Sequence, residues 1–175
     1  MQLEDILFDS SRRTADMAVS AIGDNPEIFK KFLNLALADR GRYTMRAARV
    51  VQLAAGRHPG LVLPYIRDVI HKLPGFKTDG LKRSVAKLLA EQSFSLDEDT
   101  LGVLTVVCFK WLADPLEKAA MKVYAMDILY KVALLYPEIK PELISTIEEQ
   151  FPRSTVAVVS HGKKITALLY KQKKQ

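Results

Sequence analysis

Apolar residues recur along this chain at the spacing of one helix pair, and this recurrence limits the possible folds more than any other feature. One set of positions, at steps of 33, 37, 40 and 40 residues, is Ala15, Ala48, Val85, Ala125 and Ile165. The positions three residues further on are also apolar: Ala18, Val51, Leu88, Ile128 and Leu168. A helix pair with one apolar face buries that face only by stacking on its neighbours. The sequence therefore predicts a stacked array of helix pairs.

A second type of helix alternates with the first. Its apolar positions, at steps of 33, 38 and 39 residues, are Leu33, Ile66, Leu104 and Leu143, followed one turn later by Leu37, Ile70, Cys108 and Ile147. The stretch 115–135 is apolar on nearly every side, which is typical of a helix with neighbours on several flanks. Agreement between the two sets supports a repeat of two helices.

Prolines, glycines and acidic residues separate the apolar stretches. Proline and negative charge both favour the first turn of a helix, where a backbone N–H has no intrahelical partner. The boundaries predict nine helices, at 10–22, 26–38, 42–56, 60–73, 78–92, 97–112, 115–135, 138–150 and 155–172. No stretch alternates between polar and apolar residues as a strand does. We expect an all-α fold of about nine helices in four to five stacked pairs.

Composition places the chain among ordinary globular proteins. Its 175 residues are 49% apolar and 26% charged, which suits one domain over residues 1–175. A single cysteine excludes a disulfide framework within the chain, and the N-terminal residues lack the basic segment of a signal peptide. No apolar run approaches the ~20 residues of a membrane span. We therefore expect a cytoplasmic protein that does not cross a membrane.

Three recurring features resemble the HEAT and armadillo class of helical repeats. One is the helix-pair period, and another is a proline one turn into the outer helix at Pro64 and Pro141. The aspartate usual between the helices of this class is clear only at Asp39 and Asp114. A basic residue near the start of the second helix recurs at Arg46, Arg83, Lys122 and Lys163. The resemblance implies a right-handed α-α superhelix, a HEAT-like solenoid, in which the second helix of each pair lines a concave surface that binds partners.

Charge is unevenly distributed along the chain. Residues 1–90 carry 15 basic and 9 acidic side chains, residues 91–150 carry 5 and 11, and residues 151–175 carry 6 and none. Within 40–87 there are 11 basic and 2 acidic residues. Such a distribution is compatible with a polyanionic partner, and equally with basic side chains that only keep a helix face solvated.

The basic residues supply the candidate binding site. Arg42, Arg46 and Arg49 recur at i, i+4 and i+7, so they share one helix face, and Arg13 and Arg83 align with Arg46 in the repeat. The predicted partner-binding or phosphate-binding residues are Arg13, Arg42, Arg46, Arg49, Arg83, Lys122 and Lys163. Few aromatic residues interleave with them, and only Tyr43 could serve as a stacking platform for a base.

One enzymatic alternative follows from the resemblance. The alkylpurine DNA glycosylases are HEAT-like proteins that use an aspartate and tryptophans on the concave face. Here Asp127 lies near the middle of a second helix, while Trp111 ends an outer helix, and the family's site does not map onto this chain. The repeat alignment instead predicts that Asp127 faces Lys87 and that Glu91 faces Lys131 between neighbouring helices.

Other reactive side chains have simpler interpretations. Cys108 occupies a core position and is predicted to be an inert buried thiol. The three histidines, His58, His71 and His161, lack ligand spacing and are predicted to lie at the surface or at helix ends. The helix methionines Met17, Met45, Met121 and Met126 are predicted to fill the core. We expect no catalytic residue, no cofactor and no metal.

Two classes of function remain open. The favoured one is a non-catalytic scaffold that binds a protein or peptide along its concave face. The alternative is a nucleic-acid-binding module that uses the basic residues. The acidic segment 3–11 can cover the first helix, and exposed apolar residues of the C-terminal helix could form a homodimer contact.

Overall fold

The computed structural model describes residues 3–171, and these are helical with no strand among them. The all-α prediction is therefore confirmed. The chain divides into two compact units, unit 1 within 1–94 and unit 2 within 95–175, and each is described by itself.

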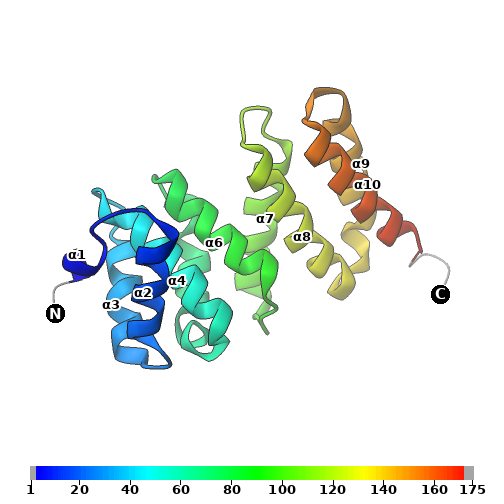
Figure 1. Ribbon diagram of the computed structural model, residues 1–175. Coiled ribbons are helices and arrows are strands. Elements are labelled where there is room, and N and C mark those ends of the chain that lie inside the picture. Colours follow the sequence, from blue (N-terminus) through cyan, green and yellow to red (C-terminus); the bar gives the residue numbers. More distant parts are fainter. Residues whose placement is uncertain (1–2, 172–175) are drawn as a thin grey trace. The chain divides into compact units, whose positions relative to one another are not determined.

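Unit 1 contains the first five predicted helices. They are α2 (Arg12–Ile22), α3 (Pro26–Leu37), α4 (Tyr43–Arg57), α5 (Ile66–Lys72) and α6 (Asp79–Glu91), with the short α1 (Leu3–Ile6) before them. Helix α4 packs against α2, α3 and α6. Figure 1 shows α2, α4 and α6 side by side, so the second helices form one layer of this unit.

Unit 2 repeats the arrangement with four helices. They are α7 (Glu98–Ala113), α8 (Ala119–Leu135), α9 (Lys140–Gln150) and α10 (Val156–Lys171). Helix α8 packs on α7 and α10, and α7 packs on α9, which makes two layers. The loops that join α7 to α8 and α9 to α10 lie at the same end of this unit (Figure 1).

The repeated apolar positions form the core. Ala15, Ala48, Val85, Ala125 and Ile165 are all buried, as are Leu33, Ile66, Leu104 and Leu143. In the two accompanying sets only Leu37 and Leu168 are half-buried rather than buried. The alignment of the repeated apolar positions thus predicted correctly which residues form the core of each unit.

Two predicted helices differ clearly in their bounds. The helix predicted at 60–73 breaks into the 3-10 turns η1 (Pro59–Leu61) and η2 (Leu63–Tyr65) before α5, because Pro59 and Pro64 have no N–H to donate. A further turn, η3 (Leu73–Gly75), follows α5. Helix α8 begins at Ala119 rather than at 115, because Asp114 caps the intervening turn by accepting from the Leu116 N–H at 2.8 Å.

The last two helices follow short turns. The turn η4 (Pro137–Ile139) precedes α9, and η5 (Phe151–Arg153) precedes α10. The predicted final residue of the C-terminal helix, 172, lies outside the described residues. Helix starts elsewhere follow the expected chemistry, since Ser11, Asn25 and Asp97 accept backbone N–H groups at the first turns of α2, α3 and α7.

Candidate functional site

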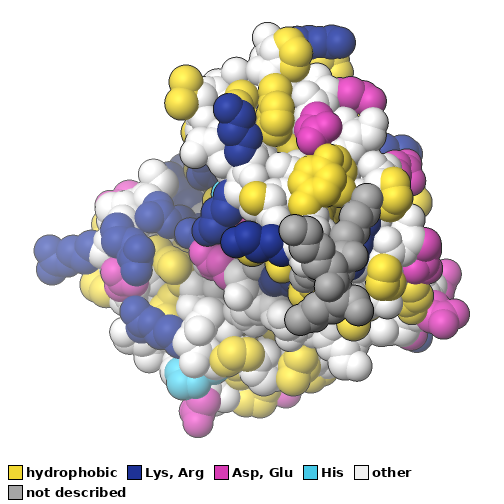
Figure 2. Space-filling model, turned by 90° about the vertical axis from the view of Figure 1, so that its right-hand side faces the viewer, with side chains coloured by type: hydrophobic (Ala, Val, Ile, Leu, Met, Phe, Trp, Pro, Cys, Tyr) yellow, Lys and Arg dark blue, Asp and Glu magenta, His cyan; other side chains and the backbone are white. Residues whose placement is uncertain are grey.

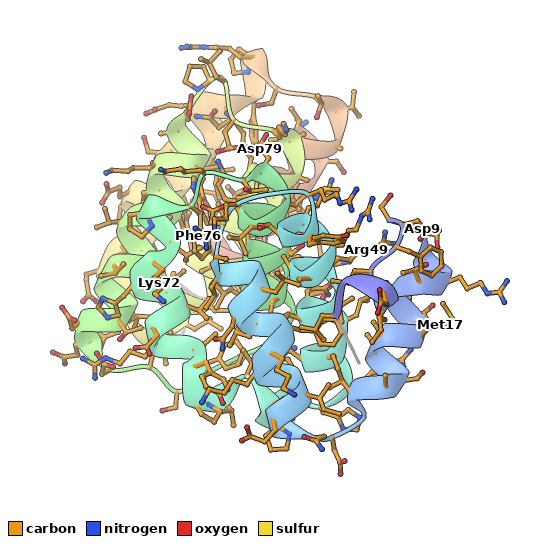
Figure 3. The ribbon with its side chains drawn as sticks, turned by 90° about the vertical axis from the view of Figure 1, so that its left-hand side faces the viewer. Asp9, Met17, Arg49, Lys72, Phe76 and Asp79 are labelled. Carbon is orange, nitrogen blue, oxygen red and sulfur yellow. The ribbon has the colours of Figure 1, made fainter. Side chains whose placement is uncertain are left out.

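Two arginines of the predicted basic face hold the N-terminal segment of the protein's own chain. Arg46 Nη1 donates to the carbonyl oxygens of Leu7 at 2.7 Å and of Phe8 at 2.9 Å, and Arg49 Nη1 donates to that of Ser10 at 3.0 Å. Figure 3 shows Arg49 reaching toward the segment that contains Asp9. Leu7 is 1% exposed, so the segment also contributes to the core. This arrangement agrees with the predicted covering of the first helix.

Electrostatics reinforce this contact. Hydrogen bonds from Thr14 and Ser11 hold the pKa of Asp9 below its ordinary value, and the charge of Arg46 adds to the effect. The Asp9 carboxylate accepts from the Ser11 N–H at 2.8 Å, which orders the turn before α2. An anion is thus already present in the turn that lies beside the basic face.

Arg42, the residue before α4, also has a partner within the chain, the side chain of Tyr43. Its Nη2 donates to the Tyr43 hydroxyl at 2.7 Å, and its guanidinium lies 4.8 Å from the centre of the Tyr43 ring. The Arg46 guanidinium lies 6.0 Å from the same ring. All three arginines of the i, i+4, i+7 row therefore have partners within the chain, and Tyr43 is covered by cations rather than open to a base.

Three other predicted site residues are exposed. Arg13 on α2, Arg83 on α6 and Lys163 on α10 make no side-chain hydrogen bond or ion pair within residues 3–171. Although they occupy similar helices of the repeat, the basic column is interrupted, because Arg46 is bound to the N-terminal segment. In unit 1, Arg13 and Arg83 are therefore separate exposed charges and do not form a continuous basic stripe.

Lys122, the seventh predicted site residue, is buried and not on the surface. It is 5% exposed on α8, and its Nζ donates to Gln150 Oε1 of α9 at 2.6 Å. Burial lowers the pKa of Lys122, the carboxylates of Asp114 and Glu117 oppose this shift, and the Arg153 guanidinium adds to it by repulsion. The ammonium has three N–H donors, and a single hydrogen bond engages it within the described part of the chain.

A small pocket opens beside Lys122 at the loop end of unit 2. Its volume is about 120 Å³, and it is lined by Ala113, Pro115, Lys122, Glu149, Gln150 and Arg153. Arg153 is exposed and makes no hydrogen bond or ion pair with any residue of the 3–171 range. Glu149 accepts from the Ser145 hydroxyl at 3.1 Å. Two cations and one carboxylate therefore line the pocket.

The two aspartates between paired helices act differently. Asp39, at φ 49°, accepts from the backbone N–H groups of Lys77 at 2.5 Å and of Thr78 at 2.9 Å, so it links two successive repeats. Partial burial raises the pKa of Asp39, but these N–H donors together outweigh it and hold the pKa below its ordinary value. Asp114, in contrast, accepts from Leu116 in its own loop.

Asp127 pairs with a histidine on the next second helix. His161 Nε2 lies 2.7 Å from Asp127 Oδ1, and both side chains are partly shielded. The predicted surface or capping role of His161 is therefore wrong. The pair spans 34 residues, whereas the column step of 40 aligns Asp127 with Ala167, so the repeat pattern could not locate it.

Lys87 and Glu91 have partners within unit 1. Lys87 Nζ lies 3.5 Å from Glu91 Oε1 one turn on, and Glu91 Oε2 accepts from Gln52 on α4 at 3.0 Å. The Gln52–Glu91 contact ties α4 to α6 inside unit 1. Trp111 is buried at 8% exposure, so it presents no open ring for a damaged base beside Asp127.

The methionines divide into two groups. Met121 and Met126 are buried as predicted, at 2% and 0% exposure. Met17 on α2 and Met45 on α4 are each 44% exposed, so their prediction as core residues is wrong. Figure 3 shows Met17 pointing away from the helices. The periodic pattern could not separate them, because methionine is apolar but tolerates exposed positions.

The remaining reactive groups offer no site. Cys108 is fully buried, and burial raises the pKa of its thiol far above the ordinary range, which makes it a poor nucleophile. Within residues 3–171 no cluster of histidine, cysteine or acidic side chains could hold a metal ion. None of the helices in that range combines the length and apolar character needed to cross a membrane.

Comparison with protein families agrees with the packing of the helices. A family model described as a HEAT repeat domain matches residues 5–168. The chain belongs to the HEAT repeat family. No curated protein and no solved structure matches the chain. Membership covers both units and confirms the resemblance drawn from the helix-pair period, the prolines and the basic positions.

Proposed function

We propose that this HEAT repeat chain is a non-catalytic scaffold that binds a protein or peptide through its second helices, the helices that the resemblance assigns to the inner surface. The observation that carries the proposal is the exposure of Met17 and Met45 on successive second helices, at 44% each. Methionine adapts to varied apolar partners and is common on binding surfaces. Exposed apolar side chains beside cations suit a protein partner better than a polyanion.

The same pattern recurs on the second helices of unit 2. Leu134 and Leu135 on α8 are 48% and 67% exposed, and Tyr170 on α10 is 48% exposed. Figure 2 views the side of the molecule where α10 ends, and basic side chains lie there beside exposed hydrophobic ones. A mixed surface of this kind supports a partner segment that carries both apolar and acidic residues.

Nucleic-acid binding is the weaker candidate. Phosphate recognition by several cations should depend steeply on salt. Arg42, Arg46 and Arg49 already have partners within the chain, which leaves Arg13, Arg83 and Lys163 as separate exposed charges. A polyanion would therefore meet fewer available cations than the sequence count suggests.

The test compares the unaltered protein with a double variant, Met17→Glu with Met45→Glu. Proteins captured from a cell extract by the unaltered protein would be identified, purified and measured for direct binding to both forms. We expect at least one purified partner to bind the unaltered protein and to lose about tenfold or more of its affinity for the variant, because two apolar contacts are replaced by charge. A Lys30→Glu variant on α3, an exposed position of an outer helix, is the matched control.

Mobility-shift assays with duplex and single-stranded DNA and RNA test the alternative. Salt-sensitive binding that Arg13→Ala and Arg83→Ala weaken for all sequences alike, with no purified protein partner, would replace the scaffold proposal. A purified protein that binds both forms equally would contradict the role assigned to the two methionines.

A further inference from the structure

Lys122 in unit 2 is a buried basic residue whose ammonium reaches a pocket and makes one hydrogen bond within the described part of the chain. Lys122 as a whole is 5% exposed, and its Nζ donates to Gln150 at 2.6 Å. It lines the 120 Å³ pocket together with Arg153. Two cations that share one small pocket repel each other, and an anion between them would remove that repulsion.

We propose that this pocket binds a single carboxylate, the side chain of an acidic residue in the partner protein, held by Lys122 Nζ and the Arg153 guanidinium. The proposal rests on the scaffold function given above and identifies the chemistry of one of its contacts. Lysine and arginine both form strong charge-assisted hydrogen bonds with carboxylates.

Size and charge favour a carboxylate over a phosphate. A volume of about 120 Å³ equals about four water molecules at their share of the liquid, enough for a carboxylate and its adjoining methylene. The pocket lining has two positive charges and one negative charge, from Lys122, Arg153 and Glu149. Asp114 and Glu117 reduce the positive potential at Lys122 further. The lining residues alone have a net charge of +1, which one carboxylate neutralises and a phosphate dianion exceeds, and Asp114 and Glu117 repel a dianion more strongly than a monoanion.

The equivalent junction in unit 1 shows what a carboxylate does at this place in the repeat. Asp39, in the loop between α3 and α4, reaches the segment before α6 and accepts from Lys77 and Thr78. Its counterpart Asp114, between α7 and α8, accepts from its own loop and leaves the pocket beside Arg153 open. An external carboxylate would occupy in unit 2 the kind of position that Asp39 occupies in unit 1.

Exposed apolar side chains next to the pocket residues indicate that the acidic residue of the partner protein has apolar neighbours. Leu116 follows the pocket residue Pro115 and is 91% exposed, and Val156 lies three residues after Arg153 and is 86% exposed. These are the two most exposed large apolar side chains of the described residues. A partner segment with leucines on each side of an aspartate would contact both the cations and the apolar side chains.

The direct test titrates the full-length protein with an acetylated, amidated peptide, Gly-Leu-Asp-Leu-Gly, and with the same peptide carrying asparagine in place of aspartate. Backbone amide shifts of residues 113–122 and 149–154 are followed by NMR. We expect saturable shifts with the aspartate peptide and about tenfold weaker binding of the asparagine peptide, because a charge-assisted hydrogen bond pair is lost.

Variants of the two pocket cations test whether the aspartate peptide binds at the pocket. Arg153→Gln changes an exposed side chain and should leave the fold intact while weakening the aspartate peptide about tenfold. Lys122→Met should have a similar effect, and its unchanged amide spectrum outside the pocket would show that it folds. Arg83→Gln, an exposed arginine of unit 1, is the matched control and should leave the affinity unchanged.

Several results would overturn the inference. These are equal binding of the aspartate and asparagine peptides, an equal loss of affinity in Arg83→Gln, and shifts of the pocket with inorganic phosphate but not with the aspartate peptide. A purified partner that binds Arg153→Gln as well as the unaltered protein would refute the pocket and leave the scaffold function standing. Peptide binding at the pocket without any protein partner would refute the scaffold function instead.

Discussion

The two units close the junctions between their repeats in different ways. In unit 1, polar side chains bind the chain itself: Asp39 accepts from Lys77 and Thr78, and Arg46 donates to Leu7 and Phe8. In unit 2, Lys122 lies one residue before the position that aligns with Arg46 and is buried beside a pocket, and Asp114 binds within its own loop. The polar groups of one repeat can therefore bind other parts of the chain, as in unit 1, or line a pocket that a ligand can reach, as in unit 2.

The difference follows from local geometry rather than from residue type. Arg46 and Lys122 are both basic and both lie near the start of a second helix, but the offset of one residue turns Lys122 by about 100° around the helix axis. Arg46 donates to two carbonyl oxygens of the N-terminal segment, whereas Lys122 donates to Gln150. Arginine also presents several donors in a planar fork, which suits two adjacent carbonyls. A repeat alignment identifies equivalent positions but cannot identify their partners.

The largest expected effect tests whether the units are separate in stability as well as in packing. Phe29→Ala on α3 should lower the free energy of unfolding by about 3–5 kcal/mol, because a side chain that is 0% exposed leaves a cavity. Leu129→Ala on α8, also 0% exposed, should cost about 2–5 kcal/mol. Hydrogen exchange should show lost protection mainly within 3–94 for the first variant and within 95–171 for the second. An equal loss across 3–171 from either variant would favour the single domain predicted from the sequence.

A smaller effect is expected when the N-terminal segment is released. Arg46→Ala removes two charge-assisted hydrogen bonds and should lower stability by about 2 kcal/mol. Amide exchange in residues 3–10 should accelerate, and the segment should become sensitive to protease. Arg83→Ala, at the aligned exposed position on α6, should change neither property. If both variants behave alike, the basic residues of unit 1 do not have the distinct roles described here.

The Asp39 junction should contribute somewhat less and should depend on pH. Asp39→Ala loses both backbone contacts and places alanine at φ 49°, at a cost of about 1–2 kcal/mol. Asp39→Asn tolerates that backbone conformation and retains one acceptor, so its effect should be smaller.

The direction of the pH dependence follows from the lowered pKa of Asp39. Its stabilising contribution is fully present above the ordinary aspartate pKa of about 4 and is lost as the pH falls through the lower folded-state pKa. Urea unfolding at pH 7 and at pH 3 should therefore show the difference between the unaltered protein and Asp39→Asn shrinking at the lower pH. A difference that grows at pH 3 would contradict this assignment.

The smallest effect concerns two helix glycines of unit 2. A Cβ at Gly162 on α10 would lie 2.8 Å from both Ile147 Cγ2 and Phe151 Cε1, so Gly162→Ala should lower stability by about 1 kcal/mol or more. A Cβ at Gly102 on α7 would meet nothing within 4 Å, so Gly102→Ala should raise stability by about 0.5–1 kcal/mol. Thermal unfolding of both variants measures the contrast. A rise in stability for Gly162→Ala would show that its close packing on Ile147 and Phe151 is not limiting.

The candidate site was only partly predictable from the sequence. The basic positions recur along the chain and were found by spacing, but Arg46 proved to be bound to the chain and Lys122 to be buried. The pocket residues Gln150 and Arg153 belong to no periodic pattern, and no sequence signal singled them out. Their role depends on the approach of two loops that are separated by the whole of α8 and α9.

The amino-acid sequence by itself determined the all-helical repeat, the division into two helix types and most of the buried positions. It could do so because a helix face and a repeat step are local, periodic properties of the chain. Only the tertiary structure decided which charges are engaged, that Asp127 pairs with His161, and that Met17 and Met45 reach the surface. Hydrogen bonds and burial depend on distances of a few ångströms between elements distant in sequence, and residue periodicity does not encode those distances.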